Sequence, residues 1–280
     1  MILVFGRSLI SRNASVPEPV NDPNQKEVEE VSTVASTVGK FVWHEQVSAD
    51  PGKAQAFYTE LFGWTTEVFK AGETDYTMIS SNGQSHGGFG KAMDGAPPPH
   101  WLSHVRVNGL EETIEKAKRA GGKLAAGPFE MSEVGRVAII TDQQGAYISA
   151  YEPEQDGPGA EGVFVWDELG TTDADGAQRF YEEVFGWTTT DLGPEYGGYR
   201  TFSRGETGIA GLMALPDASM QPHWQPYVAV EDVDATAAKA AELGAATLVE
   251  PMDVPNVGRI AVLRDPQGAT FGIIKPDPAS

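Results

Sequence analysis

The sequence predicts an α+β protein made of two copies of one domain, and each copy contains two βαβββ units. The first observation is a repeat with a constant offset of 123 residues, in which the run from Phe41 to Trp43 returns from Phe164 to Trp166. A constant offset indicates two copies of one domain with almost no insertions. The second observation is that each copy shows a strand pattern followed by a helix pattern twice.

Further anchors keep the same offset along the chain. They are Phe57-Tyr58 and Phe180-Tyr181, Phe62-Gly63-Trp64 and Phe185-Gly186-Trp187, His100-Trp101 and His223-Trp224, Gly135-Arg136 and Gly258-Arg259, and the turns beginning at Asp142 and Asp265. These anchors predict a first domain at 39–153, a linker at 154–161 and a second domain at 162–277. Each copy is long enough to enclose its own core. The preceding segment, 1–38, is predicted to be a disordered arm because it is polar and lacks sustained periodicity.

The first unit of the first copy begins with a strand pattern over 40–48. Asp50 can cap a helix that starts at Pro51, and Gly63 is expected to end it. Short strands are expected near 64–69, 76–80 and 86–90, and a Pro-rich connector follows at 96–99.

The second unit repeats this plan. A strand is expected over 101–107 and a helix over 110–120, with Gly121 and Gly122 as its stop. Three strands follow near 123–125, 137–141 and 146–151, and the turn that begins at Asp142 connects the last two.

Composition excludes several classes of function. The net charge is −20, so a nucleic-acid partner is not expected, because binding phosphates needs basic surface. The chain has no cysteine, which excludes disulfides, thiolate nucleophiles and Cys-based zinc sites. No segment is a transmembrane candidate, and the opening apolar run is too short. We therefore expect a soluble, cytoplasmic monomer or homodimer that does not bind membranes.

The repeated motifs resemble those of the vicinal oxygen chelate superfamily, which includes glyoxalase I, bleomycin-resistance proteins and extradiol dioxygenases. The similarity is greatest to its tandem two-domain bacterial members, labelled glyoxalase-like or bleomycin-resistance-like, and covers residues 40–277. The resemblance implies that the two units of each domain form a cupped barrel around one site. It also implies that catalytic members bind a divalent metal there through His and Glu side chains.

The family's metal-ligand positions carry unsuitable residues in this chain. The resemblance places them at Trp43, Leu102 and Ser149 in the first copy and at Trp166, Gln225 and Gly272 in the second. Apart from a weak Gln, none of these is a normal metal ligand. No metal site of the standard kind and no cofactor are therefore expected, although a divalent metal at a shifted site remains an alternative.

Other side chains can carry chemistry in the predicted cups. Residues two apart along a strand share a face, so Glu45 is expected beside Trp43, with His104 across the same cavity. These two are the candidate catalytic residues, as an acid–base pair or a shifted metal site that His86 would complete. The candidate ligand-binding residues are Trp43, Glu45 and His104 in the first cup and Trp166, Glu168 and Tyr227 in the second.

The remaining chemical side chains are interpreted as structural. His100 and His223 follow connectors in both copies and suit hydrogen bonding between units. His44 is expected to point away from the cup, toward the surface or a helix. Arg136 and Arg259 are expected to anchor strands.

Two functions are compatible with this pattern. The first is a protein that binds a small organic molecule in aromatic-lined cups without the standard metal. The alternative is a glyoxalase-like lyase, or a hydroxylase- or dioxygenase-type enzyme, that uses Glu45 and His104 in the first domain.

Overall fold

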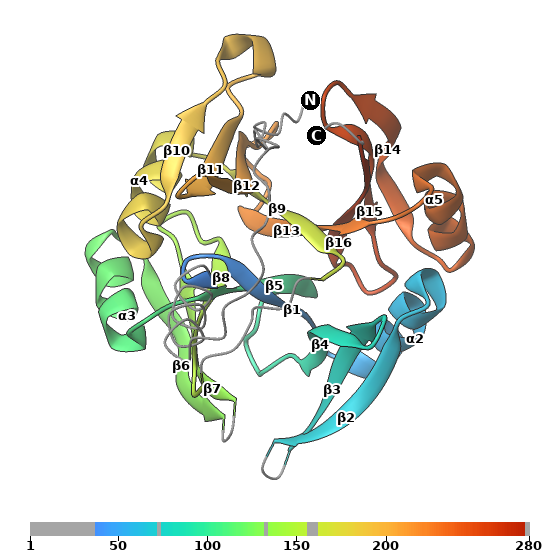
Figure 1. Ribbon diagram of the computed structural model, residues 1–280, viewed down its shortest axis with the longest axis horizontal. Coiled ribbons are helices and arrows are strands. Elements are labelled where there is room, and N and C mark those ends of the chain that lie inside the picture. The colour runs from blue at the N-terminus through green and yellow to red at the C-terminus, as the bar shows by residue number, and fades with distance from the viewer. Residues whose placement is uncertain (1–36, 72–73, 132–133, 156–161, 278–280) are drawn as a thin grey trace, which may run out of the picture.

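The computed structural model describes residues 37–71, 74–131, 134–155 and 162–277 of the chain (Figure 1). The predicted arm at 1–38 therefore falls almost entirely outside the described residues, as does most of the predicted linker. Among the residues that are described, none of the helices combines the length and apolar character needed to cross a membrane.

The first domain consists of two βαβββ units. The first unit contains β1 (Phe41–Ser48), α2 (Pro51–Phe62), β2 (Thr65–Ala71), β3 (Thr74–Ser81) and β4 (Gln84–Lys91). The second contains β5 (His100–Arg106), α3 (Leu110–Arg119), β6 (Lys123–Met131), β7 (Gly135–Thr141) and β8 (Tyr147–Pro153). Their strands form one eight-stranded sheet in the order β2-β3-β4-β1-β5-β8-β7-β6.

The second domain repeats the first. Its first unit contains β9 (Phe164–Thr171), α4 (Ala174–Phe185), β10 (Thr188–Asp191), a short 3-10 helix η1 (Pro194–Tyr196), β11 (Arg200–Arg204) and β12 (Thr207–Ala214). Its second unit contains β13 (His223–Ala229), α5 (Val233–Glu242), β14 (Ala246–Val254), β15 (Gly258–Arg264) and β16 (Thr270–Pro276). The strand order is the same, β10-β11-β12-β9-β13-β16-β15-β14, which confirms the predicted fold class.

The predicted helix signals act as expected. The Asp50 side chain accepts a hydrogen bond from the backbone N–H of Lys53, and Gly63 ends α2 in the left-handed conformation at φ 70°. In the second copy, Asp173 caps α4 in the same way, and Gly186 ends it at φ 67°. Local sequence therefore sets both ends of the first helix in each domain.

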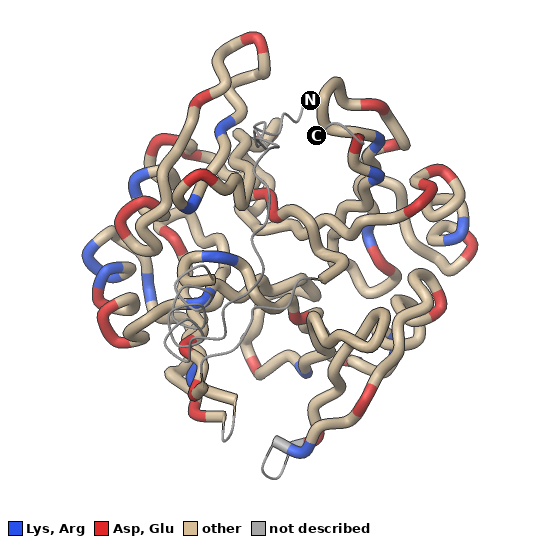
Figure 2. Tube along the Cα trace, in the orientation of Figure 1, with Lys and Arg blue, Asp and Glu red and all other residues tan. Residues whose placement is uncertain are grey.

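The units of each domain meet along one central strand pair. β1 pairs antiparallel with β5, and Trp43 lies opposite His104. In the second domain β9 pairs antiparallel with β13, and Trp166 lies opposite Tyr227. The two sheets curl away from each other, with α3 beside α4 on one flank and α2 beside α5 on the other (Figure 1). Acidic residues are spread over the helices and outer loops of both domains rather than gathered on one face (Figure 2).

Two of the hydrophobic clusters are shared between the domains, and a third lies within the second domain. The expectation of a separate core for each copy is therefore wrong, except around the second cup. One hydrophobic cluster joins Leu110 and Ile114 of α3 to Phe180 and Tyr181 of α4. A second cluster joins residues of α2, such as Tyr58, to residues of the second domain's other unit. Each cluster thus combines the first unit of one domain with the second unit of the other. Separating the domains would expose large apolar side chains.

Turn aspartates connect the domains across this interface. Oδ1 of Asp142 accepts hydrogen bonds from three backbone N–H groups of its own turn, while its Oδ2 accepts one from the Tyr181 hydroxyl of the other domain at 3.2 Å. In the equivalent arrangement, the Tyr58 hydroxyl donates a hydrogen bond to Oδ2 of Asp265 at 3.0 Å. Burial raises the pKa of Asp142, and the hydrogen bonds it accepts act in the opposite direction.

The centre of the interface contains a pair of equivalent positions that carry different residues. Nε2 of His44 lies 3.0 Å from Oδ2 of Asp167, and the Ser103 hydroxyl donates to Oδ1 of Asp167 at 2.5 Å. Asp167 stands where the first copy has His44, so the contact joins an acid with a base. As predicted, His44 points away from the cup, but it is buried between the domains rather than exposed.

These cross-domain aspartates generate a stability prediction. Asp265→Ala should lower the free energy of unfolding by about 2 to 4 kcal/mol, because it leaves buried donors unsatisfied. Tyr58→Phe removes the hydroxyl that donates to Asp265 and accepts from the Trp101 indole N–H at 2.9 Å, and it should cost about 1 to 3 kcal/mol.

Urea unfolding followed by tryptophan fluorescence measures both effects. Glu183→Ala, at an exposed position of α4, is the control and should stay within about 0.5 kcal/mol of wild type. A wild-type unfolding curve for Asp265→Ala would show that this contact does not hold the domains together.

Candidate functional site

A cavity of about 810 Å³ lies inside the curl of the first domain's sheet. Its floor is made by alternate residues of the two central strands: Trp43, Glu45 and Val47 of β1, and His100, Leu102, His104 and Arg106 of β5. Side chains two apart point to the same face of a strand, which is why these residues line one space. The opposite face of β1 is buried against the second domain, since His44, Gln46 and Ser48 are buried.

The walls of the cavity are mainly apolar, with several aromatic and sulfur-containing side chains. They include Phe69, Tyr76, Met78, Met93, Phe129, Met131, Tyr147 and Tyr151. Aromatic rings and methionines make large, adaptable apolar contacts, so this lining suits a flat organic molecule.

Glu45 and His104 face each other across the cavity floor, as the strand pattern predicts. Oε2 of Glu45 lies 3.6 Å from Nε2 of His104, and the exposed fractions of the two side chains are 22% and 7%. This distance is too long for a direct hydrogen bond. Nε2 of His104 and Oγ of Ser149, which sits opposite His104 on β8, are both buried without a hydrogen-bond partner. The site therefore holds polar atoms whose hydrogen-bonding capacity is unused.

Trp43 is held in place by a tyrosine. Its indole N–H donates to the Tyr76 hydroxyl at 2.9 Å, and burial, assisted by the negative charge of Glu45, raises the pKa of Tyr76 well above its ordinary value. The Tyr76 hydroxyl lies against Gly88, where a Cβ would come within 2.1 Å of it. The prediction from sequence missed Tyr76 and Gly88, although both recur at the same offset as Tyr199 and Gly211.

The second cup contains the equivalent residues in a packed arrangement. Glu168 is 4% exposed and accepts hydrogen bonds from Tyr199 at 3.1 Å and from Tyr227 at 3.5 Å. Burial raises the pKa of Glu168 to about 7, against the lowering effect of both hydroxyls. Trp166, Tyr199 and Tyr227 belong to one buried cluster with the apolar residues Val254, Val257, Ile260, Val262 and Ile274.

The burial of the central strands shows the same contrast between the domains. Along β1 the cup-facing residues are only half-buried, whereas the six residues of β9 from Trp166 to Thr171 are all buried. Both faces of β9 are thus covered by other residues, whereas β1 is covered only on the face opposite the cup. The predicted second-cup residues Trp166, Glu168 and Tyr227 do lie together, but they contact one another within a core.

Two facing positions differ between the cups in a coordinated way, a large residue in one being matched by a small residue in the other. The ring of Tyr227 lies directly over Gly272, where a Cβ would come within 2.2 Å of it. In the first domain the equivalent pair is His104 and Ser149. A tyrosine at position 104 would therefore need a glycine at 149.

The residues of the first cup do not fit the superfamily's metal. Trp43, Leu102 and Ser149 occupy the positions that the resemblance assigns to its ligands, and the first two offer no donor for a cation. Within the described ranges, no three His, Asp or Glu side chains come together in a way that could hold a metal ion.

His86 does not complete the Glu45–His104 pair, so that expectation is wrong. A bulge in the β3–β4 pairing between Ile79 and Ser80 turns His86 to the opposite face from Ser85, which lines the cavity. His86 is 2% exposed and instead lines a second pocket, of about 160 Å³, between the domains. Burial lowers its pKa to about 4, and nearby His44 adds to the effect.

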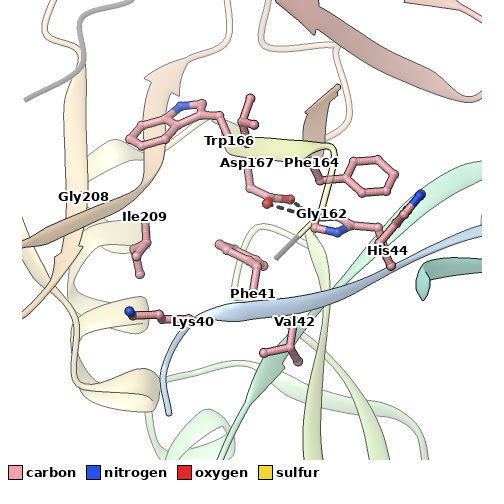
Figure 3. Close-up of a pocket in the computed structure, with 12 residues that line it drawn as sticks. Lys40, Phe41, Val42, His44, Gly162, Phe164, Trp166, Asp167, Gly208 and Ile209 are labelled. Atoms are coloured by element: carbon pink, nitrogen blue, oxygen red, sulfur yellow. Dashed lines mark hydrogen bonds and ion pairs between the residues drawn. The ribbon is translucent and has the colours of Figure 1, made fainter. Parts of the chain in front are cut away.

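Figure 3 shows this interdomain pocket, with Phe164 beside His44 and the Asp167 carboxylate joined to the His44 ring. Gly208 and Ile209 line the same pocket, and Ile209 is the counterpart of His86. The bulge recurs in the second domain between Phe202 and Ser203, which accounts for the equivalent position of Ile209.

The residues interpreted as structural have local partners. Nδ1 of His100 lies 2.9 Å from the carbonyl oxygen of Pro98, and His223 makes the same contact with Gln221. Arg136 forms ion pairs with Glu111 and Glu152, so it connects α3 to the β7–β8 pair.

Comparison with known proteins identifies the family. The family described as the glyoxalase/bleomycin resistance protein/dioxygenase superfamily matches residues 40–149 and again 164–273. The putative glyoxylase CFP32 of Mycobacterium tuberculosis is 36% identical over 247 residues, covering 84% of this chain and 94% of that protein. The anthracycline biosynthesis protein DauV of Streptomyces sp. (strain C5) is 30% identical over 257 residues, covering 85% and 93%.

Solved structures share the fold at low sequence identity. The 2,3-dioxygenase LapB from Pseudomonas sp. KL28 has a TM-score of 0.60 at 14% identity, covering 86% of this chain and 94% of that one. The Mn(II)-bound glyoxalase from Novosphingobium aromaticivorans has a TM-score of 0.58 at 13% identity, covering 87% and 86%. With two matches that span both halves, the chain belongs to the glyoxalase/bleomycin resistance protein/dioxygenase superfamily.

Proposed function

We propose that the first domain binds a small organic molecule in its cup, and that it does so without the metal of the superfamily's catalytic members. The observation that carries this proposal is the cavity of about 810 Å³, with aromatic walls and the polar pair Glu45 and His104 on its floor. Ligand sites combine apolar walls with a few convergent polar groups, and this volume suits a drug-sized ligand.

A flat polycyclic compound is the ligand class that this lining favours. Rings stack on aromatic side chains and fill a wide apolar cavity efficiently. The relative DauV, by its name, acts in the biosynthesis of anthracyclines, which are polycyclic aromatic compounds, and it covers most of this chain. Anthraquinone, the ring system at the centre of that class, is therefore a suitable first probe.

An enzyme remains the second candidate, because two titratable groups face each other across the cavity and one relative is named a putative glyoxylase. In this reading Glu45 takes a proton from a bound substrate and His104 returns one to a neighbouring atom. Both side chains reach the same space, so they can act on one bound substrate.

Binding can be tested by making the first cup resemble the second. The double variant His104→Tyr/Ser149→Gly places a tyrosine over a glycine, as Tyr227 lies over Gly272. Anthraquinone affinity should fall at least about tenfold, because the added ring fills part of the cavity.

Quenching of tryptophan fluorescence by the probe measures this affinity. The matched control, Tyr227→His/Gly272→Ser in the second cup, should bind the probe as wild type does. Equal affinity in wild type and the first-cup variant would contradict the proposed site.

The metal question has a direct test. Elemental analysis of protein purified without a histidine tag should find far less than one equivalent of nickel, zinc, iron or manganese per chain, because the donor set is unsuitable. Probe binding should also survive treatment with a chelator. A full equivalent of one metal that is lost together with probe binding would favour the metal-dependent enzyme.

The buried acid of the second cup predicts a dependence of stability on pH. The folded protein keeps the Glu168 proton up to about pH 7, whereas the unfolded chain releases it near the ordinary pKa of 4.5. Between these values the folded state binds one proton more, so the free energy of unfolding falls as pH rises, by about 3 kcal/mol in total. Glu168→Gln has no proton to lose and should not show this component.

Urea unfolding at a series of pH values, compared between wild type and Glu168→Gln, isolates the contribution of Glu168 to the pH dependence of stability. If the free energy of unfolding varied with pH in the same way in both proteins, Glu168 would not be a buried acid that stays protonated up to about pH 7. Loss of anthraquinone binding by folded Glu168→Gln would instead place a ligand site in the second cup.

A further inference from the structure

Glu45 and Glu168 occupy equivalent positions, yet their carboxylates lie in different places. Glu168 accepts hydrogen bonds from two tyrosines, Tyr199 and Tyr227. Oε2 of Glu45 lies toward His104, and its Oε1 lies in the space directly over Gly90. The two side chains therefore adopt different directions from the same point on equivalent strands.

The space over Gly90 is available only because that residue has no side chain. A Cβ on Gly90 would come within 1.7 Å of Oε1 of Glu45. The equivalent residue of the second domain is Met213, which packs against the buried cluster of the second cup. A side chain fills this space there, and Glu168 contacts both Tyr227, the counterpart of His104, and the Tyr199 hydroxyl, the counterpart of Tyr76.

We infer that Gly90 is a positioning residue that gives the Glu45 carboxylate a place beside His104 and away from the Tyr76 hydroxyl, and that the resulting pair selects ligands that carry a hydroxyl group. This inference rests on the proposed binding function of the first cup and names the chemical class that the site prefers. It gives a role to a glycine that does not itself line the cavity.

The hydroxyl preference follows from the geometry of the pair. At 3.6 Å, Glu45 and His104 are too far apart to bond directly, and Nε2 of His104 and Oγ of Ser149 lack hydrogen-bond partners. A hydroxyl can donate to the Glu45 carboxylate and accept from His104 at the same time. A ligand without one would leave buried polar groups unsatisfied, which sites of this kind penalise strongly.

The substitution that tests this inference is structurally mild. Gly90 does not have a left-handed backbone conformation, so alanine fits its backbone. The three nearest atoms to a new Cβ all belong to the Glu45 side chain, which can rotate. Gly90→Ala should therefore move Glu45 while leaving the strand in place.

The first measurement needs no ligand. A crystal structure of Gly90→Ala should show the Glu45 carboxylate hydrogen-bonded to the Tyr76 hydroxyl, as Glu168 is to Tyr199, while the wild-type structure shows it beside His104. A carboxylate that stays beside His104 in the variant would overturn the positioning role of Gly90.

The second measurement compares two probes, β-hydroxyanthraquinone and anthraquinone. Wild type should bind the hydroxylated probe at least about tenfold more tightly, and Gly90→Ala should lose most of that preference while keeping its affinity for anthraquinone. In a Glu45→Ala background, Gly90→Ala should have no further effect, because there is no carboxylate to displace. The control Met213→Gly should leave the preference unchanged.

The outcomes separate the two proposals. Failure of wild type to bind either probe counts against the proposed function, and the crystal structures then decide the role of Gly90. Tight binding without a preference for the hydroxylated probe overturns the inferred ligand class. A loss of preference that is equally large in the Glu45→Ala background overturns the link between Gly90 and Glu45.

Discussion

The antiparallel pairing of β1 with β5, repeated by β9 with β13, is the constraint on which both the cup and the domain interface depend. Side chains alternate between the two faces of a strand, so each central strand contributes to the cup on one side and to the interface on the other. Trp43 and Glu45 therefore face the cavity, while His44 between them meets Asp167 of the other domain. A shift of one residue in this register would exchange the two sets and destroy the cup and the interface together.

The interface tolerates buried polar groups because each domain supplies partners for the other. Asp142 and Asp265 satisfy their own turns and also accept a hydroxyl from the opposite domain. His44 and Asp167 meet although duplication began with identical residues at these positions, so their divergence produced a complementary pair in place of two like groups. Such contacts favour pairing of the first domain with the second within one chain, because two copies of the same domain would place like side chains together.

The sequence was sufficient to predict the architecture and the residues that share the first cup. The constant offset revealed the duplication, and alternation along one strand was enough to place Trp43 and Glu45 on a common face. The sequence was insufficient where a strand irregularity, or contacts between residues far apart in the chain, determine where a side chain points and how it packs. A bulge in β4 turned His86 to the other side, and no spacing rule shows such a bulge. The shared cores and the different packing of the two cups depend on contacts between segments that are far apart in sequence.

The difference between the cups illustrates how duplication relieves a conflict between stability and binding. A filled cup buries apolar surface and stabilises the fold, whereas an open cup leaves that surface exposed to water. Met213, Tyr227 and Gly272 together close the second cup around Glu168, and their counterparts Gly90, His104 and Ser149 leave the first cup open. Since the domains share two other hydrophobic clusters, stabilisation of the second also supports the first. The open cup can therefore keep unsatisfied polar atoms that a single domain of this size would have difficulty tolerating.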